Sequence, residues 1–291
     1  MSLPLTRRGF ALSAASLGGC AALGVEPADW AGRIAAIEAQ VGGRLGVSAA
    51  SLDGATAINY RADERFAMCS TFKAPLAACV LAHVETGALA LEQRIAFGEA
   101  DLLGYAPVTR ARVSEGALSV GDLCAAAVEV SDNTAANLLL PLVGGPEGFT
   151  LFMRSIGDEA TRLDRNEPTL NSNLPDDPRD TTTPQAMRES LGTLLYGDRP
   201  LEAASRAMLM GWMAGSTTGL QRLRAGLPEG WRVGDKTGTS GNGAVNDIAF
   251  IETPRGARLL AACYINAPDA SAQDCNAAHA DVGRAIAEAF G

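Results

Sequence analysis

The apolar residues of this chain follow a strand pattern near both ends of the sequence and a helix pattern in between. Apolar side chains alternate with polar ones, or form short unbroken runs, in five stretches bounded by turn residues such as Asp53-Gly54. These stretches are residues 45–52, 55–60, 231–237, 245–251 and 258–265. Strands from both ends can meet in one antiparallel sheet when the middle of the chain forms a separate lobe. The pattern therefore predicts an α/β (α+β) fold with a five-stranded antiparallel sheet.

Helical patterns flank this sheet and fill the middle of the chain. Asp29 can cap a helix that stops at Gly42-Gly43, and a second terminal helix is predicted over residues 277–290. In the middle, apolar residues recur at helical spacing from residue 70 to about 160, and again from 184 to 215. We therefore expect terminal helices beside the sheet and further helices in the inserted lobe.

A segment of about twenty residues, 163–183, interrupts the helical pattern, because it is rich in proline and poor in apolar residues. A loop of this length inside a compact domain usually has a function. We predict an all-helical lobe over residues 67–218, which includes this loop. A sheet lobe over residues 26–66 and 219–291 completes the expected domain organisation.

Residues 1–25 are typical of an export signal. A twin-arginine motif, Thr6–Phe10, precedes a weakly apolar stretch, residues 11–24, that is too short to span a membrane. We therefore expect a periplasmic protein with no stable membrane span; an ordinary amphipathic first helix is the alternative. Residues 17–20 also resemble a lipobox, in which the cysteine is lipidated. A lipid anchor at Cys20 is therefore a second possibility for the exported chain.

Composition excludes several classes of partner. The formal net charge is −9, whereas nucleic-acid binding requires clustered Lys and Arg. The only histidines are His83 and His279, and the six cysteines include no CxxC pair. We therefore expect no metal site and no cofactor. A monomer that acts on a small molecule is the expectation that remains.

Lysine is rare in this chain and occurs where chemistry is expected. Only two of the 24 basic residues are lysines, Lys73 and Lys236, and a lysine can lose its proton whereas an arginine cannot. Lys73 follows Ser70 by three residues at the start of a predicted helix, so the two side chains share a face. A basic lysine can activate a serine hydroxyl, and backbone N–H groups at a helix start can stabilise an oxyanion. Alone, this spacing is a weak signal.

Two further motifs follow in order along the chain. Ser131-Asp132-Asn133 can be a plain helix cap, and Lys236-Thr237-Gly238-Thr239 can be an edge strand with a glycine bulge. However, the three motifs together contain both lysines. The combination of SxxK, SDN and KTG resembles the class A β-lactamases and the penicillin-binding proteins.

The resemblance extends from about residue 30 to the end of the chain. Residues 165–171 resemble the RxExxLN segment of class A β-lactamases, and residues 179–184 resemble the other end of their Ω-loop. The resemblance implies that Arg165 and Asp180 pair across the neck of this loop. It also implies the fold of the β-lactamases and penicillin-binding transpeptidases.

The resemblance also implies a role for each site residue. The catalytic residues would be the nucleophile Ser70, its proton partner Lys73, the proton donor to the leaving nitrogen Ser131, and the general base Glu167. Whether Lys73 or Glu167 accepts the first proton stays open. The backbone N–H groups of Ser70 and Thr239 would form the oxyanion hole. The substrate-binding residues would be Asn133, Asn171, Lys236, Thr237, Thr239, Arg222 and Tyr105.

These roles predict a serine β-lactamase that hydrolyses penicillins and cephalosporins. Residues 69–73, Thr239 and Arg222 also resemble broad-spectrum and carbapenem-hydrolysing members, so carbapenem hydrolysis is the boldest expectation. A D-alanyl-D-alanine peptidase or transpeptidase, or a penicillin sensor that stays acylated, is the alternative. Those proteins would lack the deacylating role of Glu167.

Cys69 resembles a cysteine that some members bridge to a residue just after the KTG motif. That position is Ser240 here, so we expect Cys69 to be unbridged. Cys124 also matches a bridging cysteine, but its usual partner position is Ala77. The pairing of Cys79, Cys124, Cys263 and Cys275 therefore stays open.

Overall fold

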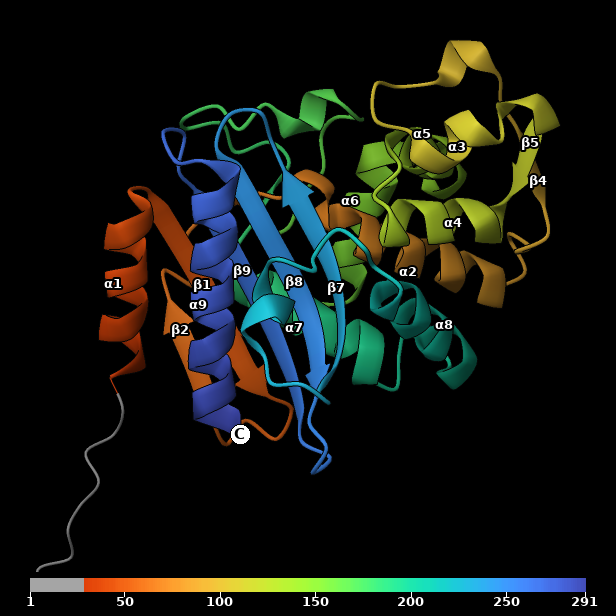
Figure 1. Ribbon diagram of the computed structural model, residues 1–291. Helices are drawn as coiled ribbons and strands as arrows, with labels where there is room; N and C mark the ends of the chain where they lie inside the picture. Colours follow the sequence, from red (N-terminus) through yellow and green to blue (C-terminus); the bar gives the residue numbers. More distant parts are fainter. Residues whose placement is uncertain (1–28) are drawn as a thin grey trace, which may run out of the picture.

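The computed structural model describes residues 29–291, and the expected export signal and Cys20 lie outside this range. Five strands form one antiparallel sheet in the order β2-β1-β9-β8-β7, as predicted (Figure 1). The strands are β1 (Arg44–Ser51), β2 (Ala57–Tyr60), β7 (Arg232–Thr239), β8 (Ala244–Glu252) and β9 (Arg258–Asn266). The first and last parts of the chain meet where β1 pairs with β9.

Helices cover both faces of the sheet, and for that reason its central strands are almost continuously buried. The terminal helices α1 (Trp30–Val41) and α9 (Ala272–Phe290) lie on one face, and α7 (Pro184–Tyr196) packs against β1 and β9 on the other (Figure 1). The Asp29 carboxylate accepts a hydrogen bond from the N–H of Gly32, and α1 ends at Gly42 in a left-handed conformation. The predicted beginning and end of α1 are therefore confirmed.

The inserted lobe is built around one buried helix. This helix is α2 (Lys73–Glu85), and nine of its residues, from Lys73 to Leu81, are buried in succession. Helices α4, α5, α7 and α8 pack against it. The other α-helices of the lobe are α3 (Pro107–Ala111), α4 (Val120–Glu129), α5 (Asn133–Leu139), α6 (Gly145–Ser155) and α8 (Ala203–Ala214). The 3₁₀ helices of the described chain are η1 (Cys69–Phe72), η2 (Glu99–Asp101), η3 (Val113–Glu115), η4 (Leu140–Val143), η5 (Thr169–Asn171) and η6 (Leu223–Gly226).

The lobe is not entirely helical, and the sequence prediction needs correction on this point. Strands β4 (Arg94–Ala96) and β5 (Ala117–Ser119) pair within it, and β3 (Phe66–Ala67) pairs with β6 (Thr181–Thr182). Segments of two or three residues are too short to show an alternating pattern, so they cannot be predicted from the sequence pattern.

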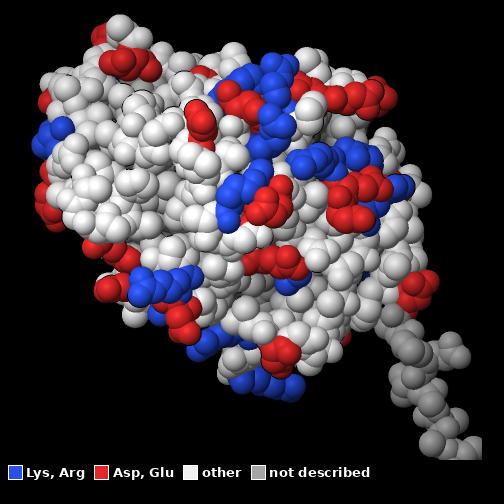
Figure 2. Space-filling view, turned by 180° about the vertical axis from the view of Figure 1, so that it is seen from behind, with Lys and Arg blue, Asp and Glu red and all other residues white. Residues whose placement is uncertain are grey.

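The surface charge is mixed. On the face shown in Figure 2, arginines lie beside acidic side chains rather than in one continuous basic area. Within residues 29–291, none of the helices is long and apolar enough to cross a membrane.

The two lobes meet where β7 passes η1. A Cβ atom added at Gly238 would lie 2.5 Å from the carbonyl oxygen of Met68 and 3.1 Å from the Cβ of Cys69. Because only glycine fits at this distance, Gly238 allows the KTG segment of β7 to contact the turn that contains Ser70.

We predict that Gly238→Ala lowers the free energy of unfolding by about 1–3 kcal/mol, because a backbone carbonyl must move to admit the methyl group. Urea unfolding at 25 °C measures this change. Gly241→Ala is the matched control, since nothing lies within 4 Å of its added Cβ, and we expect a change of less than about 0.5 kcal/mol. Equal effects of the two substitutions would contradict the close approach.

Candidate active site

Ser70 lies in η1, the 3₁₀ turn that directly precedes α2. The sequence predicted that Ser70 opens the long helix itself, but the α-helix begins three residues later at Lys73. Cys69, just before the serine, has a φ of 47°, a left-handed conformation that tightens the turn. The hydroxyl of Thr71 donates to the carbonyl of Met68 at 2.9 Å and holds the turn closed. Ser70 is only 8% exposed.

Lys73 is fully buried beside this serine. Its Nζ lies 2.9 Å from Oε1 of Glu167, donates to Oδ1 of Asn133 at 2.5 Å and to the carbonyl of Ser131 at 3.0 Å. Burial lowers the pKa of Lys73, and the charge of Glu167 opposes that shift. The amine therefore loses its proton more easily than an exposed lysine does.

Glu167 faces both Ser70 and Lys73. Its Oε1 accepts a hydrogen bond from Ser70 Oγ at 3.2 Å, and its Oε2 accepts one from Asn171 Nδ2 at 2.5 Å. The backbone of Glu167 is held on both sides by one side chain of α5: its N–H donates to Asn137 Oδ1 at 3.0 Å, and its carbonyl accepts from Asn137 Nδ2 at 2.9 Å. Sequence reasoning missed Asn137. Its position four residues after Asn133, on the same face of α5, was the available signal.

Ser131 lies between the two lysines. Lys236 Nζ donates to Ser131 Oγ at 3.0 Å, and Lys73 Nζ lies 3.4 Å from the same oxygen. Burial and the charge of Lys73 hold the pKa of Lys236 well below its usual range. Asp132 is also the N-cap of α5, as the simpler interpretation predicted, because it accepts the N–H of Ala135 at 2.9 Å. The SDN segment is therefore both a helix cap and part of the site.

A cavity of about 430 Å³ opens next to these groups. Its lining residues are Ser70, Tyr105, Ser131, Asn133, Asn171, Thr218, Arg222, Thr237 and Thr239. Arg222 donates to Thr239 Oγ1 at 2.7 Å and to the carbonyl of Gly238 at 3.0 Å, and Tyr105 is 53% exposed. Thr218, which sequence reasoning missed, contacts Thr237 through their hydroxyls at 2.7 Å. The structure thus brings together all of the site residues that the sequence predicted.

Comparison with known proteins identifies the family. The family model described as the β-lactamase enzyme family matches residues 30–290. The chain is 46% identical to the β-lactamase Toho-1 of Escherichia coli over 83% of this chain and 82% of that one, and 48% identical to a β-lactamase of Citrobacter koseri over 85% and 84%. A structure of the class A β-lactamase of the last common ancestor of Gram-negative bacteria superposes with a TM-score of 0.88, at 51% identity, over 91% of this chain and 100% of that one. The chain belongs to the class A serine β-lactamases.

The Ω-loop of this class A β-lactamase is closed at its neck by Asp180. Arg165 Nε donates to Asp180 Oδ2 at 2.5 Å, which confirms the predicted pair. The other carboxylate oxygen accepts the backbone N–H of Asp164 at 2.7 Å and that of Arg165 at 3.0 Å. Asp180 is fully buried, and these bonds fix the loop that contains Glu167.

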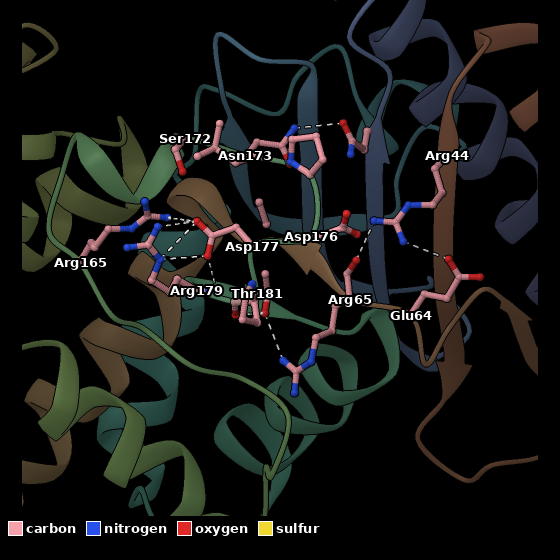
Figure 3. A pocket seen from close by; sticks show the side chains of 15 residues that line it. Arg44, Glu64, Arg65, Arg165, Ser172, Asn173, Asp176, Asp177, Arg179 and Thr181 are labelled. Atoms are coloured by element: carbon pink, nitrogen blue, oxygen red, sulfur yellow. Dashed lines mark hydrogen bonds and ion pairs between the residues drawn. The ribbon is translucent and has the colours of Figure 1, made fainter.

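Residues 172–179, the far limb of the loop, line a second cavity of about 320 Å³ (Figure 3). Arg165 and Arg179 reach into it and face Asp177 at 3.6 and 2.9 Å. Asn173 holds the limb at its other end, because its Nδ2 donates to the carbonyl of Asn242 and to Oδ1 of Asn266. The far limb is thus held by contacts near its two ends, and the cavity, rather than packed side chains, lies against its middle.

The described cysteines of this β-lactamase, Cys69, Cys79, Cys124, Cys263 and Cys275, are all buried free thiols. Burial and the charge of Glu167 raise the pKa of Cys69, so its thiol stays protonated although it adjoins Ser70. Within residues 29–291, none of the His, Cys, Asp and Glu side chains gather into a group that could hold a metal ion.

Proposed function

We propose that this β-lactamase hydrolyses penicillins and cephalosporins through an acyl-enzyme on Ser70, and that water activated by Glu167 deacylates it. The main support for this proposal is the position of the Glu167 carboxylate, whose Oε1 lies 3.2 Å from Ser70 Oγ. A base at that distance can first receive the serine proton and later deprotonate a water beside the ester. Asn171, which donates to the other oxygen of the same carboxylate, is the second ligand of that water.

Acylation begins with attack of Ser70 Oγ on the carbonyl carbon of the lactam. The new C–O bond forms as the serine proton leaves to Glu167 or Lys73, whose polar atoms are 2.9 Å apart. The C–N bond then breaks, and the nitrogen takes a proton from Ser131, which Lys73 and Lys236 flank. The backbone N–H groups of Ser70 and Thr239 stabilise the oxyanion.

Substrate binding divides between two edges of the cavity. Lys236, Thr237, Thr239 and Arg222 bind the substrate carboxylate, since they provide two cations and two hydroxyls at one edge. Asn133 and Asn171 bind the amide side chain at the other edge, and Tyr105 lines the mouth.

Both alternative functions require that the acyl-enzyme formed with a β-lactam reacts with water only slowly. A peptidase or transpeptidase would stay acylated by a β-lactam for a long time, and a sensor would stay acylated. The general base Glu167, held by Asn137 and Asn171, supports rapid hydrolysis instead.

We predict that Glu167→Ala accumulates an acyl-enzyme with benzylpenicillin and lowers kcat by about 10²–10⁴-fold, because the ester loses its general base. Intact-mass spectrometry after mixing measures the adduct, and absorbance measures turnover. Ser70→Ala is the matched control and should show neither adduct nor turnover. Undiminished turnover by Glu167→Ala would reject the proposed deacylation.

We further propose that the enzyme also hydrolyses carbapenems, and the hydrogen bond from Arg222 to Thr239 Oγ1 at 2.7 Å favours this activity. The arginine fixes the threonine hydroxyl and adds a positive charge behind it, which suits a carboxylate on a compact ring system. A carbapenem substituent crowds the water beside Glu167, so deacylation becomes the slower step.

With imipenem, we expect rapid acylation of Ser70 and measurable turnover at a rate well below that for benzylpenicillin. Loss of absorbance at substrate excess gives the rate, and mass spectrometry gives the fraction acylated. An imipenem adduct that persists without turnover would contradict carbapenem hydrolysis and leave the penicillin activity standing.

We propose that residues 1–25 direct export through the twin-arginine route, so that a monomeric enzyme acts in the periplasm. The motif at Arg7 and Arg8 supports this location, and lipidation of Cys20 would instead keep the enzyme at a membrane. Cell fractionation should place the native protein in the osmotic-shock fraction and the variant with Arg7→Lys and Arg8→Lys in the cytoplasm. Export of that variant would contradict the route, and recovery of the native protein in the membrane pellet would indicate the anchor.

A further inference from the structure

Two buried carboxyl groups lie behind the substrate-carboxylate edge of the site, on neighbouring strands. Asp235 of β7 and Asp247 of β8 are both fully buried. Asp247 pairs directly with Thr237 across the two strands, and Asp235 precedes Thr237 by two residues. Asp235 and Asp247 therefore occupy diagonal positions on one face of the sheet, close enough for the charge of Asp235 to act on Asp247.

One oxygen of each carboxyl group is held by the same turn, η6. Arg224 donates to Asp235 Oδ2 at 2.7 and 2.9 Å, and the backbone N–H of Leu223 donates to Asp247 Oδ2 at 3.1 Å. The remaining oxygens, Oδ1 of Asp235 and Oδ1 of Asp247, are buried and have no hydrogen-bond partner among the described residues. Two neighbouring buried acceptors without a donor are a costly arrangement unless a proton lies between them.

The charges around the two groups indicate which of them carries the proton. Asp235 has an ion-pair partner in Arg224, with the Asp235 side chain fully buried. Within residues 29–291, Asp247 has no ion-pair partner. Burial, followed by the charge of Asp235, raises the pKa of Asp247 well above its usual range. The other charged or titratable groups near the pair are Arg222, Cys263 and Lys236. Cys275 and His279 lie near Arg222.

We propose that Asp247 is a neutral carboxylic acid that shares its proton with Asp235, and that this acid pair positions Arg222 for the substrate carboxylate. The second half of the proposal rests on the function proposed above for Arg222. Aspartic acid pairs that share one proton are known where two carboxyl groups cannot both ionise.

The pair acts on Arg222 through two backbone segments, the one that contains Arg222 and the one that contains Asp247. Leu223, which Asp247 holds, directly follows Arg222, and Asn246, whose carbonyl accepts from Arg222 at 2.5 Å, directly precedes Asp247. The loop before Arg222 also passes close to Asp235, since a Cβ added at Gly219 would lie 2.3 Å from Asp235 Oδ1. If the shared proton is lost, two buried anions repel each other and η6 moves away from β7 and β8. Arg222 then loses its place beside the carboxylate edge.

Proton linkage tests the shared proton without any measurement of activity. A group whose pKa is raised in the folded state stabilises the protein fully below its unfolded pKa, here 3.8, and loses that contribution as the pH rises through the folded value. Asp247→Asn removes this titration and keeps the geometry, because an amide donates to Asp235 and accepts from Leu223. We therefore compare the unfolding equilibrium constant of the native enzyme with that of Asp247→Asn. From pH 5 to the pH at which the shared proton is lost, the ratio of the two constants should rise about tenfold for each pH unit.

Urea unfolding at pH 5, 6, 7 and 8 measures this ratio. Asp269→Asn, at an exposed position, is the matched control and should leave the ratio to the native enzyme independent of pH. A ratio for Asp247→Asn that does not change with pH would show that both carboxyl groups are ionised and would overturn the proposal.

Steady-state kinetics test the positioning role. Asp247→Asn at pH 7 should keep KM for benzylpenicillin within about twofold. Asp247→Ala should raise KM about tenfold with a smaller change in kcat, because it removes the shared proton from Asp235 Oδ1 and leaves the backbone N–H of Leu223 without an acceptor. An unchanged KM in Asp247→Ala would overturn the positioning role. If the native enzyme hydrolyses no β-lactam, the proposed function fails, while the pH series of unfolding still decides whether the proton is shared.

Discussion

The ion pair between Lys73 and Glu167 is the interaction on which the arrangement of the site depends. The two charged atoms lie 2.9 Å apart, and both side chains are fully buried. Removing two charges from water costs several kcal/mol for each ion, so the pair is stable only where further hydrogen bonds surround it. Asn133 and the carbonyl of Ser131 provide them for the lysine, and Asn171 for the carboxylate. Because these groups come from α2, α5 and the Ω-loop, the ion pair forms only when three segments meet.

Two of those segments, α5 and the Ω-loop, are fixed by polar side chains that do not line the cavity. Asp132 caps α5 and also accepts the hydroxyl and the N–H of Thr109, so α3 and α5 are held together. Asn137 binds both backbone groups of Glu167, and Asp180 closes the neck of the loop. The distance from Glu167 to Ser70 is therefore set by groups outside the cavity. A substitution at one of them changes the position of the base without changing any reacting atom.

The sequence predicted the sheet well because strands buried on both faces produce apolar runs with clear ends. The start of α9 was predicted at residue 277 but lies at Ala272, since its first turn is capped by the polar residues Ser271 and Asp274 and shows no apolar period. The site residues were predictable because their spacing is that of a known family. Asn137 and Thr218 were not, because their roles arise from contacts between distant segments. Such contacts leave no periodic pattern in the sequence.

The same network also holds backbone strain at the site. Cys69, Ser131 and Asp180 adopt φ angles of 47°, 61° and 58°, and each of them belongs to a segment that positions a functional group. A left-handed conformation costs a residue other than glycine about 1–2 kcal/mol. It persists here because the adjoining polar groups are bonded: Lys73 binds the carbonyl of Ser131, and Arg165 binds the carboxylate of Asp180. Relaxation of any one turn would break bonds to a buried charge, which costs more than the strain it relieves. Buried charge and strained backbone therefore stabilise each other, and the site keeps one geometry before substrate arrives.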